Sequence, residues 1–370
     1  MKKTATGIAA FILAFIMLFT AFTSSFSAAQ ATFSADAYST IVTASDFQTD
    51  DEAAYNRFAT VLGKMKKDGM PVPHSVLVGG DYSKMQLDIA APGVVLIKNR
   101  FLSVYPDANP NSVICIQGNH DNPSPVFAKT GLYDMGTYSL FCINEDSFPW
   151  RQYLRGEETV KKTASALESS LNNLKKQGDT RPVIVLTHVP LHHSTRSGGG
   201  DNLYSSYIFN VLNNAAKDMD IIFLFGHNHS STYDDYIGGA VNFMKAGDTI
   251  RIPDPEKRSE EVYKEETLNF TYTNCGYIGY SDNSNSGAST NKLTAMAIEL
   301  CNDKINFVRY CESGLFSTES VERINEAGDS YDTGAKFDKP IVGNESGWKM
   351  SEAFWSLILG FLSKLGFIKF

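Results

Sequence analysis

The stretch VICIQGNHD, residues 113–121, decides the fold of this chain. It opens with a short apolar run from Val113 to Ile116 and continues into Gly118-Asn119-His120-Asp121. An apolar, largely β-branched run of this length that ends near a glycine is typical of a buried strand. The amide, imidazole and carboxyl groups that follow are of the types that bind metal ions. The stretch therefore predicts a strand that presents metal-ligand residues at its carboxyl end.

Four other segments repeat this combination of a strand and ligand-type residues. The pairs are Ile41–Ala44 with Asp46-Phe47-Gln48, Val76–Val78 with Gly80-Asp81, Val183–Leu186 with Thr187-His188, and Ile221–Phe225 with Gly226-His227-Asn228-His229. In an open α/β sheet the carboxyl ends of neighbouring strands converge on one crevice. Residues that are far apart in the sequence can therefore meet there around one or two cations.

In their order along the chain, the five motifs resemble the signature of the calcineurin-like metallophosphoesterase family, which runs D-x-H, G-D, G-N-H-[DE], H and G-H-x-H. The similarity extends from about Ile41 to Cys311. One position departs from it, because Gln48 stands where most members have the histidine of the first motif. The resemblance implies an α/β fold built as a two-sheet sandwich flanked by helices, in an exported member of bacterial type.

The resemblance also implies a binuclear metal centre. Asp81 would be the carboxylate that bridges the two cations. The other ligands would be Asp46, Gln48 and His229 for the first metal, and Asn119, His188 and His227 for the second. Mixed oxygen and nitrogen donors suit divalent Mn, Fe or Zn, and the neutral amide of Gln48 favours Mn.

His120 and Asp121 are the candidate catalytic residues. In the family, the residue that corresponds to His120 faces the substrate and protonates the leaving group or stabilises the transition state. Several relatives orient this histidine with an aspartate, but here that position is Lys84. The orienting group is therefore missing or comes from another residue, with Asp121 and Asp46 as candidates.

A polar, glycine-rich loop follows His188 and ends at Asn202. Its Arg196 could close over a substrate phosphate. Alternatively the loop is solvated, and Asp201 or Asn202 caps the helix predicted for Leu203–Ala216.

Helices and further strands complete the predicted fold. The apolar spacing predicts amphipathic helices over Asp50–Lys67 and around Val160–Leu174. Later strands are predicted over Leu268–Asn274, Leu293–Leu300 and Ile305–Tyr310, and residues 302–304 would turn the last two into a hairpin. These late strands suit the second sheet of the family fold.

Composition limits the function classes. The chain has 370 residues, 43% of them hydrophobic, and a formal net charge of −8. It carries no basic block outside the extreme N-terminus, which argues against nucleic acid as a partner. A small phosphate ester remains possible, because a metal pair would supply local positive charge. The five cysteines are an odd number and predict no disulfide framework.

The two ends of the chain differ from its centre. Lys2 and Lys3 precede an apolar run from Gly7 to Phe22, which predicts a signal peptide over residues 1–31 or, alternatively, an uncleaved membrane anchor. The metallophosphoesterase domain is predicted over residues 32–311, and a polar linker over 312–347. Residues 348–370 form an apolar, amphipathic tail that could lie on a membrane surface, pack on the domain or dock to a partner.

Together these features predict an exported phosphoesterase, extracellular or associated with the cell envelope. It would hydrolyse phosphate mono- or diesters through attack of a metal-bound hydroxide at a binuclear centre. The alternative is a surface-held binding protein with a degenerate site, because Gln48 and Lys84 both depart from the family pattern.

Overall fold

The computed structural model describes residues 33–48, 52–82, 90–144, 156–192, 202–227, 243–256, 263–279 and 294–326. Several predicted features lie outside these residues: the signal peptide, Lys84, Arg196, His229, the linker beyond residue 326 and the apolar tail. Within the described residues, no helix is long and apolar enough to cross a membrane.

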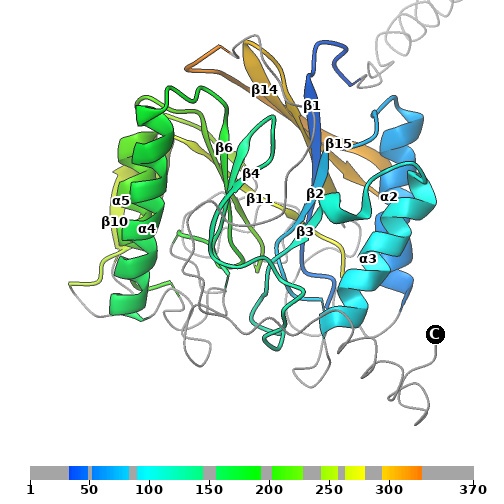
Figure 1. The fold of residues 1–370 in the computed structure, drawn as a ribbon, viewed down its shortest axis with the longest axis horizontal. Coiled ribbons are helices and arrows are strands. Elements are labelled where there is room, and N and C mark those ends of the chain that lie inside the picture. The colour runs from blue at the N-terminus through cyan, green and yellow to red at the C-terminus, as the bar shows by residue number, and fades with distance from the viewer. Residues whose placement is uncertain are drawn as a thin grey trace, which may run out of the picture.

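Two sheets form the centre of the molecule (Figure 1). The first has the strand order β15-β14-β13-β1-β2-β3, with β12 also paired to β13. Only the pairs β1–β2 and β2–β3 in it are parallel. Its strands are β1 (Ser39–Ala44), β2 (Ser75–Val78), β3 (Val113–Cys115), β12 (Gly276–Tyr277), β13 (Thr294–Leu300), β14 (Lys304–Cys311) and β15 (Gly314–Glu322).

The second sheet has the order β4-β5-β6-β7-β11-β8. Strands β5, β6, β7 and β11 run parallel, and β4 and β8 are antiparallel edges. The strands are β4 (Gly131–Asp134), β5 (Ser139–Cys142), β6 (Val183–Leu186), β7 (Ile221–Phe225), β8 (Phe243–Met244) and β11 (Thr271–Asn274). A separate antiparallel pair joins β9 (Thr249–Pro253) to β10 (Tyr263–Thr267).

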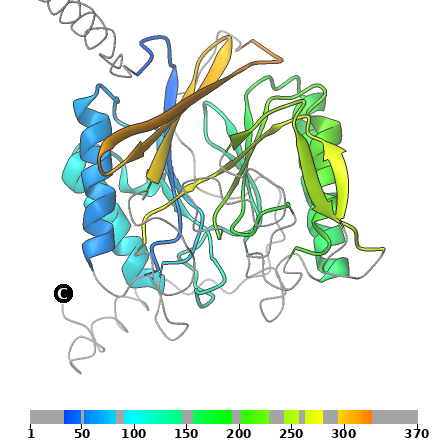
Figure 2. The same cartoon turned by 180° about the vertical axis from the view of Figure 1, so that it is seen from behind.

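Helices cover the outer faces of both sheets. Helices α2 (Glu52–Lys67) and α3 (Ala90–Val104) lie beside the first sheet, and α4 (Glu157–Lys176) and α5 (Ser205–Ala215) beside the second. The view from behind shows the two helix pairs on opposite sides of the sandwich (Figure 2). A short 3-10 helix, η1 (Pro110–Ser112), leads into β3. The expected two-sheet sandwich flanked by helices is confirmed.

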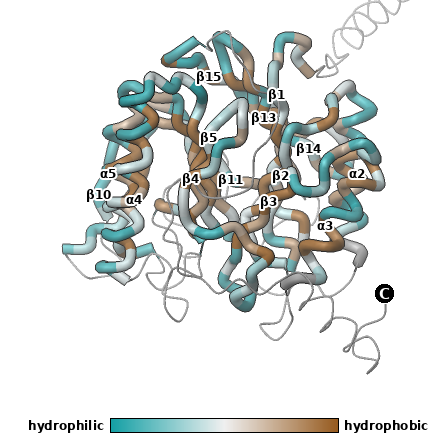
Figure 3. Tube along the Cα trace, viewed as in Figure 1, coloured by the Kyte–Doolittle hydropathy of each residue, from teal (hydrophilic) through white to brown (hydrophobic). Residues whose placement is uncertain are grey.

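Three apolar cores hold these layers together. One joins α4 and α5 to the second sheet, one fills the space between the sheets, and one joins α2 and α3 to the first sheet. Strand β2 shows why its sequence is apolar throughout: Val76 and Val78 face the helices, whereas Leu77 faces the other sheet. A parallel strand that is buried on both faces needs an unbroken apolar run. Brown, hydrophobic segments accordingly follow the central strands in Figure 3.

The five strands predicted before the ligand motifs are β1, β2, β3, β6 and β7, and the two predicted amphipathic helices are α2 and α4. The hairpin predicted at residues 302–304 joins β13 to β14.

The chain after Cys311 differs from its prediction. The sequence predicts a polar linker from residue 312, but Gly314–Glu322 forms strand β15 along the edge of the first sheet. All of its residues are exposed or only partly buried, so no buried apolar face marks the strand. Backbone hydrogen bonds to β14 form it instead.

Candidate metal centre

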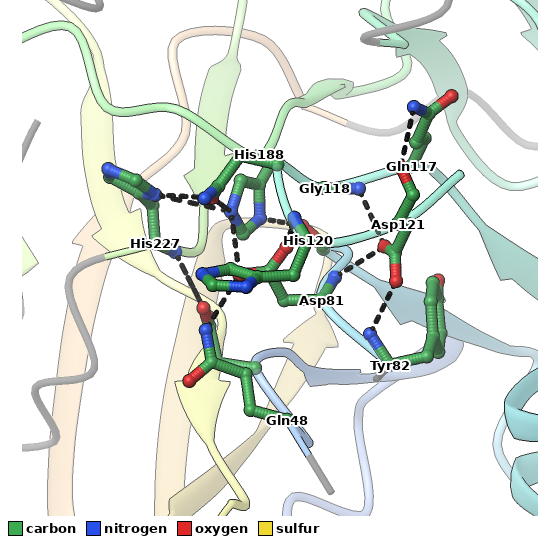
Figure 4. Close-up of polar contacts among 12 residues, drawn as sticks. Gln48, Asp81, Tyr82, Gln117, Gly118, His120, Asp121, His188 and His227 are labelled. Atoms are coloured by element: carbon green, nitrogen blue, oxygen red, sulfur yellow. Dashed lines mark hydrogen bonds and ion pairs between the residues drawn. The ribbon is translucent and has the colours of Figure 1, made fainter. Parts of the chain in front are cut away.

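Ligand-type side chains from both sheets meet at the carboxyl ends of five strands (Figure 4). They are Asp46 after β1, Asp81 after β2, Asn119 after β3, His188 after β6 and His227 after β7. The structure thus brings together five of the seven predicted metal ligands. Gln48 lies beside them, and His229 is outside the described residues.

Three donor atoms form the centre of this cluster. Asn119 Oδ1 lies 2.8 Å from His188 Nε2 and 2.8 Å from His227 Nδ1, and the two imidazole nitrogens are 3.3 Å apart. Asp81 Oδ2 lies 3.4 Å from His188 Nε2. Ligands about 2.1 Å from one cation are separated by about 3.0 to 3.4 Å in octahedral or tetrahedral geometry. The donor set therefore fits a transition-metal cation.

The tautomer of His188 is fixed by the residue that precedes the second motif. His188 Nδ1 lies 2.7 Å from the carbonyl oxygen of Gly79. A carbonyl only accepts hydrogen bonds, so Nδ1 carries the proton and donates it. The lone pair of Nε2 then points into the cluster, as metal-binding histidines require.

Two buried carboxylates give the site its negative charge. Asp46, Asp81 and His188 are fully buried, and each places a ligand atom within 4.8 Å of the others. Burial raises the pKa of Asp81, but when His188 and His120 are protonated, attraction to them and their hydrogen bonds outweigh burial and hold the pKa well below its usual range. Buried anions need compensating positive charge, which a cation provides.

Backbone strain is concentrated at the same place. Among the described residues, the non-glycine residues with positive φ are Asp46 (55°), Gln48 (40°), Asp81 (60°) and His227 (68°). Each such residue costs on the order of 1–3 kcal/mol and persists only where its surroundings enforce it. All four lie in the predicted ligand motifs. Backbone strain that destabilises the fold therefore accompanies the orientation of these side chains.

Two motif glycines allow the ligand loops to touch. A Cβ atom on Gly80, whose φ is +102°, would lie 2.6 Å from the backbone nitrogen of Gly118. A Cβ atom on Gly118 would collide with the carboxylate and backbone of Asp81. Only glycine lets these loops approach so closely.

Asp121 holds the backbone of two ligand loops. Its carboxylate accepts the N–H groups of Asp81 at 2.7 Å, Tyr82 at 2.9 Å and Gly118 at 2.8 Å. Burial and the charge of Asp81 raise the pKa of Asp121 to about 7, although the three N–H donors act in the opposite direction. Within the described residues, no hydrogen bond joins this carboxylate to the His120 imidazole. The observed contacts of Asp121 therefore assign it to the backbone of the ligand loops, and its orientation of His120, for which Asp46 is the other candidate, stays a prediction.

His120 lies beside the cluster. Its backbone N–H donates to Asp81 Oδ1 at 2.8 Å, and the residue is partly exposed. The first motif also contacts Asp81: Gln48 Nε2 donates to Asp81 Oδ2 at 2.9 Å. Arg196, the predicted substrate contact, is outside the described residues.

The loop after His188 is anchored by Tyr272, which the sequence did not single out, and by Asn202, which was expected to cap a helix. The Tyr272 hydroxyl accepts the N–H groups of Leu191 and His192 and lies 2.7 Å from His192 Nδ1. Asn202 donates to the carbonyls of Pro190 and His192 instead of capping α5, which has no side-chain cap. Tyr272 lies inside a predicted strand, where nothing distinguishes it from a core residue.

An aromatic stack supports the first two motifs. Phe47 stacks on Tyr55, with ring centroids 5.1 Å apart, and on Tyr82 at 6.4 Å. The Tyr55 hydroxyl donates to the Tyr82 carbonyl. Because Phe47 follows Asp46 and Tyr82 follows Asp81, packing of these rings fixes the backbone beside both carboxylates. The sequence signal for this role was the place of two of the rings: Phe47 lies inside the first motif, and Tyr82 directly follows the second.

A match to a known protein family agrees with the residues found at this site. The model of the calcineurin-like phosphoesterase family matches residues 39–231, more than half of the chain. A dimetal phosphatase from Danio rerio is similar in structure, with a TM-score of 0.46 and 9% identity over 78% of this chain and 100% of that one. GAP50, the anchor in the inner membrane complex of Plasmodium, gives a TM-score of 0.45 and 14% identity over 80% of this chain and 90% of that one. Comparison with curated protein sequences gave no match. On the strength of the family match, the chain belongs to the calcineurin-like phosphoesterase family.

Proposed function

We propose that the protein is an exported metal-dependent phosphoesterase that hydrolyses phosphate mono- or diesters. The observation that carries this proposal is the convergence of Asn119, His188 and His227 within 3.3 Å of one another beside the buried Asp81. A pair of divalent cations, when bound, supplies a nucleophilic hydroxide near neutral pH and stabilises charge on the phosphoryl oxygens.

Asp46, Asp81, Asn119, His188 and His227 would hold the metal ions, with His229 as a further proposed ligand. The burial of Asp46, Asp81 and His188 excludes bulk water from their ligand atoms, and His188 is already in the tautomer that binds metal. Mn²⁺ is the proposed cation, with Fe²⁺ and Zn²⁺ as alternatives, because the donors mix oxygen and nitrogen.

His120 would act on the leaving group. Its backbone is fixed to Asp81, while the residue is partly exposed and is not one of the predicted ligands. Histidine changes charge near neutral pH, so its imidazolium can donate a proton to the departing ester oxygen. Arg196 is proposed to contact a substrate phosphate oxygen.

Export and attachment to an envelope complete the proposal. They are supported by the sequence of residues 1–31 and by the apolar residues 348–370. The negative net charge supports a small phosphate ester, rather than nucleic acid, as the substrate.

The second candidate is a surface-held binding protein with a degenerate site. The hydrogen bond between Gln48 and Asp81 favours it, because a residue expected to ligate metal is instead engaged with another ligand residue.

The test uses the full chain with chromogenic phosphate monoesters and diesters. We expect turnover that requires Mn²⁺, stops on chelation and is abolished in His188→Ala. The matched control is His74→Ala, because His74 lies at the amino end of β2 and contacts the Met135 carbonyl. Near-empty metal sites without turnover under added Mn²⁺ would instead support the binding protein.

A further inference from the structure

Gln48 is tied to Asp81 at two points. Its side-chain Nε2 donates to Asp81 Oδ2 at 2.9 Å, and its backbone N–H donates to the Asp81 carbonyl at 3.0 Å. A carboxylate accepts hydrogen bonds and donates none, so the nitrogen of the amide, not its oxygen, faces Asp81. Gln48 makes these contacts with a φ of 40°, a strained backbone conformation for a residue other than glycine.

The number of free lone pairs on the Asp81 carboxylate limits how many cations it can coordinate. Oδ1 accepts the backbone N–H of His120 at 2.8 Å, and Oδ2 accepts Gln48 Nε2. Each carboxylate oxygen offers about two acceptor sites. Oδ2 retains one, and this oxygen lies 3.4 Å from His188 Nε2. A single oxygen that bridges two cations would need both of its sites.

The two sides of the centre consequently differ. On one side, Asn119, His188 and His227 converge, and the Gly79 carbonyl holds His188 in the metal-binding tautomer. On the other side, Asp46 already accepts the His227 backbone N–H at 3.0 and 3.2 Å, and Gln48 presents a proton where the family presents a histidine lone pair.

We propose that Gln48 is a positioning residue that hydrogen-bonds Asp81 instead of ligating metal, and that the centre is asymmetric. One cation is held tightly on the side of Asn119, His188 and His227, and a second is held loosely on the side of Asp46. This inference rests on the proposed function, because it concerns the same metal centre.

The test measures bound Mn²⁺ in the full chain by elemental analysis after extensive dialysis, and its affinity by calorimetry. We expect the wild type and Gln48→Leu to retain one cation each, because leucine frees an acceptor site on Asp81 but offers the second cation no ligand. The affinity for the retained cation should be about tenfold weaker in the leucine variant, because Asp81 loses its hydrogen-bond donor. Gln48→His should retain two cations, since an imidazole restores a nitrogen ligand. The matched control is Gln177→His, an exposed position at the end of α4, which should retain one.

Two results would contradict the inference, and they can be told apart from failure of the proposed function. Two retained cations in the wild type and one in Gln48→Leu would make Gln48 a ligand and overturn the inference. One cation in Gln48→His would overturn it as well, because Gln48 would not then limit the second site. If the wild type turns over substrate in either case, the proposed function stands. If the wild type neither binds metal nor turns over substrate, the proposed function itself is wrong.

Discussion

The carboxylate of Asp121 accepts a hydrogen bond from the backbone nitrogen of Asp81 at 2.7 Å. The buried Asp121 thus fixes the backbone that carries the buried Asp81 carboxylate. The same carboxylate binds the N–H group of Gly118 and thereby holds the second and third motifs together. Asp121, which directly follows His120 in the sequence, is thus a structural anchor of the candidate metal centre.

Asp121→Asn should weaken that anchor. An amide offers one acceptor oxygen, and its NH₂ group would face a backbone N–H donor. We expect a loss of about 1–3 kcal/mol in the free energy of unfolding and a 10- to 100-fold weaker Mn²⁺ affinity. Calorimetric unfolding and metal titration measure both. Asp107→Asn, at an exposed position, is the control and should change neither. Wild-type values in Asp121→Asn would contradict the anchoring role.

His120→Ala should separate acid catalysis from metal binding. We expect the bound metal to remain, while kcat falls by about 10²- to 10⁴-fold for esters with poor leaving groups and less for activated phenols, which need no proton. Steady-state kinetics on a leaving-group series tests this, with metal content measured in parallel. Equal losses on good and poor leaving groups would argue against proton donation, and loss of metal would make His120 a ligand.

Asp81→Asn should empty or badly disorder the centre. A neutral amide cannot balance positive charge as a carboxylate does, and its NH₂ group would face one of the two donors, the His120 N–H or Gln48 Nε2, from which Asp81 now accepts a hydrogen bond. Metal stoichiometry measures the effect. Asp303→Asn, at an exposed turn, should keep wild-type stoichiometry. Retention of the full metal content in Asp81→Asn would show that Asp81 is dispensable.

Gly118→Ala should push apart the second and third motifs, because the added Cβ meets the Asp81 carboxylate. We expect a destabilisation of about 1–3 kcal/mol together with loss of metal. Gly63→Ala is the matched control: its Cβ meets no atom within 4 Å, and it lies inside α2. Alanine there should stabilise by about 0.5–1 kcal/mol. Chemical denaturation measures the free energy of unfolding of both variants. Equal changes in the two would contradict the predicted clash with Asp81.

Removal of Trp348–Phe370 should release the protein from anionic liposomes and leave hydrolysis of small substrates intact. Liposome co-sedimentation and kinetics on the same preparation measure the two properties. Loss of folding in the truncated chain would instead assign the tail to packing on the domain. Undiminished liposome binding would place membrane attachment elsewhere in the chain.

The sequence predicts the strands that carry ligands well, because each is an apolar run that both faces of a sheet require. It does not predict α3, whose first turn contains Pro92 and Gly93. Proline is tolerated in a first turn, and a Cβ atom on Gly93 would lie 2.7 Å from the Tyr55 hydroxyl. Both residues therefore serve a helix although they commonly interrupt one.

The candidate site was predictable by residue type but not by hydrogen bonding. Motif order indicates that Asp81, Asn119 and His188 meet, whereas the partners of Gln48 and Asp121 depend on tertiary geometry. Both side chains are engaged by a neighbouring ligand loop, and no local pattern in the sequence encodes such long-range contacts.

The donors of the candidate centre come from two different sheets: Asp81 and Asn119 follow strands of the first, and His188 and His227 follow strands of the second. A cation shared among them would cross-link the halves of the sandwich and bind the folded chain in preference to the unfolded one. Such linkage stabilises the fold by about 2.7 kcal/mol when free metal reaches 100 times its dissociation constant. The lifetime of the folded chain would then follow the supply of metal in its surroundings.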